Sequence, residues 1–267
     1  MKVHHLNAGT MCPASARLVN GEGGWLQRAR LVCHVLLVES QQGLVLVDTG
    51  MGLADIAQPA RLGPGWVRLT APTLSPEEAA VSQVRALGFD PAEVRHVLPT
   101  HLDRDHAGGM ADFPKAAVHV HRTEHASALR DRRYRPAHLA DLGQADLRLY
   151  DDGGETWFGF QGVRALDERE PEILLVPLRG HTHGHCGVAV KSEGRWLLHA
   201  GDAYFHHAQV EAGGAAPLGL RLFQRLADSD SQQRAANQAR LRELALGHPG
   251  EVEVFCAHDP KELARHA

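Results

Sequence analysis

Short apolar runs rich in β-branched residues recur along the chain and predict most of its strands. The runs His34–Glu39 and Leu44–Val47 are separated by Ser-Gln-Gln-Gly, which predicts a hairpin. Val94–Pro99 predicts a further strand, and a polar segment follows it directly in the sequence. The other predicted strands are Lys2–Asn7, Ala117–Val120, Trp157–Phe160, Gly162–Arg164, Ile173–Pro177, Val188–Lys191, Trp196–His199 and Val252–Cys256.

Helical patterns follow these runs of strands. Ser75 as N-cap, Pro76 at the first helical position and Glu78 in a capping box predict a helix that stops at Gly88. Ser231–Leu246 has the apolar spacing of a longer helix. Further helices are expected at Thr123–Leu129 and Pro260–Arg265. Since the strands come in antiparallel-type runs with helices after each run, the pattern predicts two mixed sheets covered by helices.

In two segments the apolar residues recur with neither the spacing of a helix nor that of a strand. Gly52–Pro72 carries several glycines and prolines, and we interpret it as a long loop on the substrate side. Arg130–Asp152 is charged, with Arg132, Arg133 and Arg135 close together. A solvated helical insertion is the favoured interpretation of this segment, and an anion-binding patch is the alternative.

Charge and cysteine usage narrow the possible partners and compartments. The 267 residues carry a net charge of -4, so we expect no nucleic-acid or anionic-membrane surface. The first residues lack the apolar run of a secretory signal, and no window resembles a membrane span, so a cytoplasmic location is expected. Cys12, Cys33, Cys186 and Cys256 form no CxxC pair, which favours reduced thiols over disulfides or a zinc ribbon.

The candidate chemistry is concentrated in Thr100–Gly109, which reads THLDRDHAGG. This segment packs two imidazoles and two carboxylates into one loop after a predicted strand: His101, Asp103, Asp105 and His106. Neutral imidazole nitrogen and ionised carboxylate oxygen are the ligands that divalent transition metals take in open, catalytic sites. A total of 19 histidines beside 32 acidic residues agrees with metal chemistry but does not establish it.

Three later segments add donors, each after a predicted strand. They are Arg179–His185, His199–Asp202 and Ala257–Asp259, and they contribute His181, Asp202 and His258. Side chains at strand ends on one rim of a scaffold can converge. Seven candidate ligands are too many for one tetrahedral zinc and suit two metals that share a carboxylate.

These motifs resemble those of the metallo-β-lactamase-fold hydrolase superfamily. THLDRDHAGG, GHTHGH, HAGD and AHD occur in the family's order, together with the LVDTG strand end at Leu46–Gly50. The resemblance implies an α/β fold, with one domain over residues 1–267 built as an αββα sandwich of two mixed β-sheets flanked by helices. It also implies the ligand sets. His101, Asp103 and His181 would hold the first metal, Asp105, His106 and His258 the second, and Asp202 would bridge them.

One position departs from the family pattern. The family usually has HxHxDH, whereas the middle histidine is Asp103 here. Because carboxylate also binds zinc, the first site need not be lost. We expect two divalent metal ions, with zinc as the first expectation and manganese or iron(II) as alternatives, because an oxygen ligand makes a site more hospitable to them than an all-imidazole triad. An enzyme with one metal is the alternative.

The resemblance also suggests roles around the metals. Asp48 matches a family position that hydrogen-bonds near the metals without ligating them, and His185 matches a supporting histidine. Asp105 is a candidate catalytic residue, because it can orient a hydroxide or carry a proton to the leaving group. Tyr204 is a second catalytic candidate, since related lactonases place a tyrosine near here, although at a different spacing.

The expected function is a metal-dependent hydrolase in which a hydroxide held by the metals attacks a lactone or other carboxylic ester. The expected partner is therefore a small ester or lactone, with acyl-homoserine lactones as one candidate class. The chain resembles stand-alone lactonase-type members in length. The alternatives are a thioester hydrolase of the glyoxalase II type and a metal-binding protein without turnover.

Overall fold

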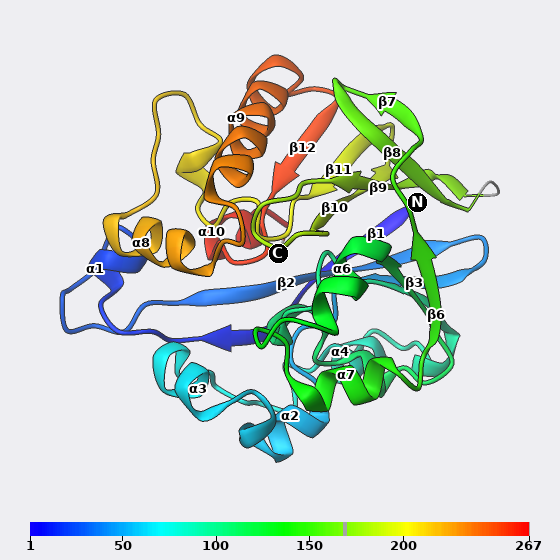
Figure 1. Cartoon of the computed structure of the whole chain (residues 1–267), viewed down its shortest axis with the longest axis horizontal. Helices are drawn as coiled ribbons and strands as arrows, with labels where there is room; N and C mark the ends of the chain where they lie inside the picture. Colours follow the sequence, from blue (N-terminus) through cyan, green and yellow to red (C-terminus); the bar gives the residue numbers. More distant parts are fainter. Residues whose placement is uncertain (168–169, 267) are drawn as a thin grey trace.

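Two six-stranded sheets stack face to face, with helices outside both, in a computed structural model that describes residues 1–167 and 170–266 (Figure 1). The strand orders are β1-β2-β3-β4-β5-β6 and β12-β11-β10-β9-β8-β7. The first sheet consists of β1 (Lys2–Met11), β2 (Leu31–Ser40), β3 (Gly43–Val47), β4 (Val94–Leu98), β5 (Ala117–His121) and β6 (Asp146–Tyr150). The second consists of β7 (Glu155–Trp157), β8 (Phe160–Asp167), β9 (Glu170–Pro177), β10 (Cys186–Ser192), β11 (Arg195–His199) and β12 (Val252–Phe255).

Both sheets are mixed, which confirms the expected fold class. In the first sheet, β1, β2 and β3 pair antiparallel, and β3 to β6 pair parallel. The predicted hairpin is present, with Ser40 opposite Gly43. In the second sheet only β11 and β12 are parallel. The helices are α1 (Ala16–Val19), α2 (Leu53–Ala57), α3 (Pro64–Thr70), α4 (Ala80–Ala86), α5 (Arg104–Ala107), α6 (Arg122–Ala128), α7 (Pro136–Leu142), α8 (Leu218–Ala227), α9 (Ser231–Gly247) and α10 (Pro260–Leu263).

Side-chain alternation along the strands divides the core into layers. In β2, Leu36 and Val38 join the cluster between the two sheets, whereas Val35 and Leu37 face the helices outside the first sheet. Because both faces of β2 are buried, its sequence is a continuous apolar run without polar alternation. On the second sheet, α9 packs Leu241 and Leu244 against the outer face. The result is the expected αββα sandwich.

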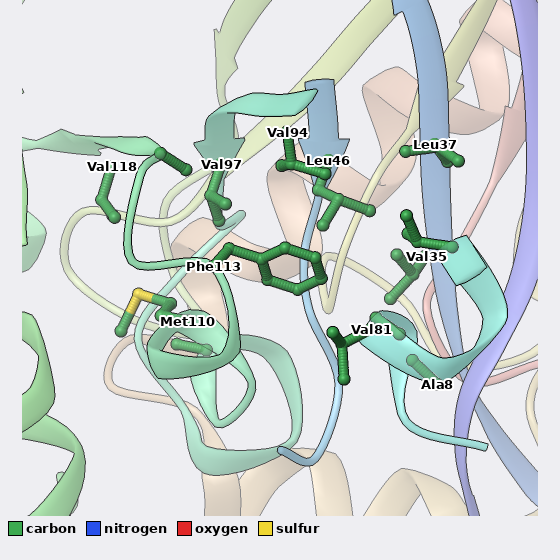
Figure 2. Packing of buried hydrophobic residues seen from close by; sticks show 14 of the residues in the cluster. Ala8, Val35, Leu37, Leu46, Val81, Val94, Val97, Met110, Phe113 and Val118 are labelled. Atoms are coloured by element: carbon green, nitrogen blue, oxygen red, sulfur yellow. The ribbon is translucent and has the colours of Figure 1, made fainter. Parts of the chain in front are cut away.

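Phe113 is a central side chain of the cluster between the first sheet and its helices. Figure 2 shows its ring surrounded by Val97, Leu46 and Met110, and only 2% of the residue is exposed. Side chains packed this closely can shift only partly into the space left by a removed ring, so a cavity would remain.

We expect Phe113→Ala to lower the free energy of unfolding by about 3–5 kcal/mol, because it removes buried apolar surface and leaves a cavity. Equilibrium unfolding in urea measures this change. Leu129→Ala is the control, since that side chain is 64% exposed, and its loss should cost less than about 0.5 kcal/mol. Equal losses in the two variants would contradict the packing described for Phe113.

Two local expectations for the segment before β4 are corrected by the structure. Gly52–Pro72 is not a loop, because Pro59 and Pro64 begin short helices there. The Ser75 capping box does not form: the Glu78 carboxylate instead accepts hydrogen bonds from the backbone N–H and hydroxyl of Thr10, and α4 begins at Ala80.

The charged segment Arg130–Asp152 is not simply a solvated helix, because it contains both a helix and a strand of the first sheet. It contains α7 and also β6, whose Leu147 and Leu149 pack towards the core. The alternation of apolar and polar residues in β6 is the signal that could have identified it as a strand. Arg133 in this segment is largely buried and reaches the metal-ligand motifs.

None of the four cysteines forms a disulfide, as expected, and Cys33, Cys186 and Cys256 are buried. Among the described residues, no helix is both long and apolar enough to cross a membrane.

Candidate metal centre

The candidate ligands come from loops that follow four strands in the two sheets. The loop after β4 supplies His101 to His106, and α5 begins within it, at Arg104. The loops after β9, β11 and β12 supply His181, Asp202 and His258. The structure thus brings together all seven predicted ligands on one rim of the sandwich, although they lie up to 157 positions apart in the sequence.

Asp202 lies at the middle of this group, and its two carboxylate oxygens face two different sets of ligands. Its Oδ1 lies 3.3 Å from His106 Nε2 and 3.1 Å from His258 Nε2. Its Oδ2 lies 3.2 Å from His181 Nε2 and 3.9 Å from His101 Nε2. We call the set His101, Asp103 and His181 the first half, and the set Asp105, His106 and His258 the second half.

The spacings match those of atoms around a tetrahedral metal. With metal–ligand bonds of about 2.0–2.1 Å, two ligand atoms lie roughly 3.3–3.4 Å apart. In the first half, Asp103 Oδ2 lies 3.3 Å from His101 Nε2 and 3.4 Å from His181 Nε2. In the second half, Asp105 Oδ2 is 3.7 Å from His258 Nε2. The first half therefore has the dimensions of a metal site. The second half is more open: Asp105 and His258 group with Cys33, and His106 groups with His101 and Asp202.

Unpartnered buried atoms support the same conclusion. His101 Nε2, His106 Nε2 and Asp202 Oδ1 are fully buried and have no hydrogen-bond partner within residues 1–167 and 170–266. Burying a polar atom without a partner is unfavourable, and a carboxylate oxygen facing imidazole nitrogens is a donor set for a divalent metal. This set fits the metal that the ligand motifs imply.

The outer nitrogens of the histidines are held by other groups, which fixes their ring orientation. Asp48 Oδ2 lies 2.9 Å from His106 Nδ1, and its Oδ1 accepts from the Thr100 N–H at 2.6 Å. His258 Nδ1 lies 2.7 Å from the Val32 carbonyl oxygen. With the outer nitrogen protonated, Nε2 keeps its lone pair for a metal. Asp48 thus occupies the supporting position expected for it.

His185 also supports the centre without facing it. Its Nδ1 lies 3.0 Å from the Leu178 carbonyl oxygen, and its Nε2 accepts a hydrogen bond from the Asp202 backbone N–H at 3.0 Å. Both ring nitrogens are therefore occupied, and the imidazole fixes the backbone that carries Asp202.

Charges within the group alter its proton affinities. Burial disfavours the charged form of Asp202, but His258, His106 and His181 outweigh it and hold the pKa of its carboxyl well below the usual value. Burial likewise opposes charge on His106, yet Asp202 and Asp48 raise its pKa well above the usual value. The Asp202 carboxylate and the imidazoles around it thus favour each other's charged forms, and a metal at the centre would compete with protons for the same nitrogens.

A cavity of about 530 Å³ opens beside these ligands. Asp103, Asp105, His181, Asp202 and His258 form its polar floor. Its apolar wall comes from β1, β2, α3, the loop after β11 and α8: Met11, Leu31, Trp66, Phe205, Leu220, Phe223 and Leu226. Thr70, Asp131 and the arginines Arg104, Arg132 and Arg133 also line the cavity. A polar floor under an apolar wall suits a small molecule with one reactive polar group and an apolar body.

Three residues around the centre were not identified from the sequence. Glu124 is buried and links two ligand loops, accepting from the Leu102 N–H at 2.9 Å and the Thr182 hydroxyl at 2.6 Å. Cys33 offers a sulfur within 4.8 Å of ligand atoms of Asp105 and His258. Arg133 donates to Asp103 at 2.7 Å through Nε. All three lie outside the motifs, so no spacing rule could have indicated them.

Tyr204, by contrast, does not reach the cavity. Its side chain is fully buried in the core beneath the second sheet, and its hydroxyl donates to Glu262 Oε1 at 2.9 Å. Burial raises the pKa of Glu262 to about 7, which limits the charge that this pair carries. The structure therefore gives Tyr204 a packing position and not the predicted catalytic one.

We expect Tyr204→Phe to keep catalytic activity within about twofold of the parent rate, because Tyr204 is not among the residues that line the cavity. It should lower the free energy of unfolding by about 1–2 kcal/mol, since a buried hydrogen bond is lost. Steady-state kinetics and urea unfolding measure the two effects. A hundredfold loss of kcat with unchanged stability would restore the catalytic role.

Comparison with known proteins identifies the family. The model of the metallo-beta-lactamase superfamily matches residues 28–248, and the chain belongs to this superfamily. Within it, the chain is a metallo-hydrolase, and relatives of the chain are named metallo-hydrolases and N-acyl homoserine lactonases.

One such relative is a probable metallo-hydrolase of Mycobacterium tuberculosis, 41% identical over 99% of this chain and 83% of its own length. The N-acyl homoserine lactonase AiiA of Bacillus thuringiensis subsp. kurstaki is 25% identical over 85% of each chain. A solved N-acyl homoserine lactone hydrolase, with N-hexanoyl-L-homoserine at its catalytic metal centre, superposes with a TM-score of 0.73. It is 21% identical, and the match covers 99% of this chain and 95% of that one.

Proposed function

We propose that this protein hydrolyses a lactone or other carboxylic ester at the centre formed by the seven ligands, which holds up to two divalent metals. The observation that carries the proposal is Asp202, whose two oxygens face the two halves at metal-ligand spacing beside an open cavity. His101, Asp103 and His181 would hold one metal, and Asp105, His106 and His258 the other.

A divalent metal bound there supplies a Lewis acid for the carbonyl oxygen and lowers the pKa of water at the site. The chain's own residues supply the rest of the chemistry. The carboxylate of Asp105 borders the cavity, so it can orient the attacking water. The same carboxylate can pass a proton to the leaving alkoxide. Asp48 and the Val32 carbonyl hold His106 and His258 in place throughout.

The apolar wall selects the body of the substrate. Trp66, Phe205 and Phe223 line the same cavity as the ligands, so they can cover an acyl chain while the ester carbonyl faces the ligands. The similarity to N-acyl homoserine lactonases makes an N-acyl lactone the first substrate to test.

The decisive experiment is a substrate panel. Purified protein loaded with zinc, manganese or iron(II) is given N-acyl homoserine lactones of several chain lengths, simple esters, thioesters, β-lactams and phosphodiesters, and acid release is followed. We expect lactones or esters to be cleaved fastest, with kcat/KM rising with acyl length because of the apolar wall. Preference for thioesters would favour a glyoxalase II type of activity, and no turnover by metal-loaded protein would overturn the proposal.

His258→Ala tests the second half. Loss of one of its ligands should lower metal occupancy and reduce kcat at least about 100-fold, because ligands and their supports together set metal affinity. Elemental analysis and kinetics measure the two effects. His183→Ala is the matched control: it belongs to the same kind of histidine motif but its side chain is exposed, and we expect parent-like values. Near-normal metal content in His258→Ala would remove this residue from the ligand set.

A further inference from the structure

Arg133 reaches the first half of the centre from outside the ligand motifs. Its Nε donates to Asp103 Oδ1 at 2.7 Å, and its Nη2 donates to Asp103 Oδ2. The same Nη2 lies 2.5 Å from His181 Nε2. The guanidinium therefore approaches the two first-half atoms that would otherwise point at a metal.

Competition for these atoms is direct. His181 Nε2 has one lone pair in the neutral ring, and that lone pair can serve either an N–H of Arg133 or a metal, but not both. On its other side, His181 Nδ1 faces Asp228 Oδ1 at 3.6 Å, which favours the proton on Nδ1. His101 Nε2 makes no such contact with Arg133 and has no hydrogen-bond partner in the described part of the chain.

The guanidinium is held in this position by a complete set of acceptors. Its Nη1 donates to the carbonyl oxygens of Ala227 and His181, so all five N–H groups of the fork have acceptors. The next residue, Tyr134, is buried, and its hydroxyl donates to Glu124 Oε1 at 2.8 Å. This bond anchors the segment beside the ligand loops, so Arg133 has a built position in the fold.

Charge agrees with the geometry. A lone ionised carboxylate is disfavoured at a buried position, and the Arg133 guanidinium forms an ion pair with Asp103 that supplies the opposite charge. A family-type histidine at position 103 would offer no negative charge for a guanidinium to neutralise. Asp103 and Arg133 therefore form a matched pair, and the second half, which Arg133 does not contact, keeps its unpartnered atoms.

We propose that the Arg133 guanidinium competes with metal for Asp103 and His181. As a result, the second half binds metal first, and the first half binds metal only when the guanidinium moves away from these two residues. This inference rests on the proposed metal centre, but it does not depend on which ester is cleaved.

The test is a metal titration of metal-free protein with zinc, followed by calorimetry and by elemental analysis after dialysis. We expect the parent protein to bind one equivalent tightly and a second at least about tenfold more weakly. In Arg133→Met the weaker equivalent should tighten at least tenfold, while the tight one stays within about threefold. Two equivalents of equal affinity in the parent, or no tightening in Arg133→Met, would overturn the proposal.

Two further variants keep the result interpretable. Arg130→Met is the matched control, because this nearby arginine is exposed and is not among the residues that line the cavity, and its titration should match that of the parent. The double variant Arg133→Met/Asp103→Asn removes both members of the pair, so it leaves no unpaired buried charge to unfold the protein. Its first half lacks the carboxylate ligand, and we expect it to stay weak. Tightening equal to that of Arg133→Met would show that Arg133 does not act through Asp103.

The two proposals fail separately. Metal stoichiometry tests Arg133 even if no ester in the panel is cleaved, and ester cleavage tests the proposed function whatever the order of metal loading.

Discussion

The structure depends on one buried carboxylate surrounded by imidazoles. Asp202 is 4% exposed and faces four histidines from both sheets. A carboxylate in such a position is tolerated only when positive charge compensates it, whether that charge is carried by protonated imidazoles or by metals. Other contacts of the centre keep this arrangement in place: the outer hydrogen bonds orient the imidazole rings, and His185 fixes the Asp202 backbone.

The sequence predicted the architecture well because its strongest signals are local. β2 is a long run of buried apolar residues, and the ligand motifs follow predicted strands at fixed short spacings, so their convergence on one rim could be expected. Errors arose where tertiary contacts override local preference. Glu78 has the spacing of a capping box, yet it bonds β1, 68 residues away, and no local rule contains that partner.

Within the centre too, residues in local motifs could be predicted, whereas residues placed there by contacts distant in sequence could not. Asp48 and His185 lie in motifs and were assigned supporting positions in advance. Arg133 lies 30 residues from Asp103 in a charged segment, where an arginine on a solvated helix and one in an ion pair have the same local pattern. Tyr204 shows the opposite error, since two positions after Asp202 the chain turns its side chain towards Glu262 and away from the cavity.

The division of ligands between the two sheets has a consequence for the chain as a polymer. The first sheet supplies His101 to His106 and the second supplies His181, Asp202 and His258, so an ion bound at the proposed centre would tie together segments that are far apart in sequence. Such a tie closes long loops, whose entropy the unfolded chain otherwise keeps. Each tenfold rise in free metal above its dissociation constant then adds about 1.4 kcal/mol to the folded state. At the proposed centre, metal supply would thereby set the free energy of unfolding as well as the chemistry.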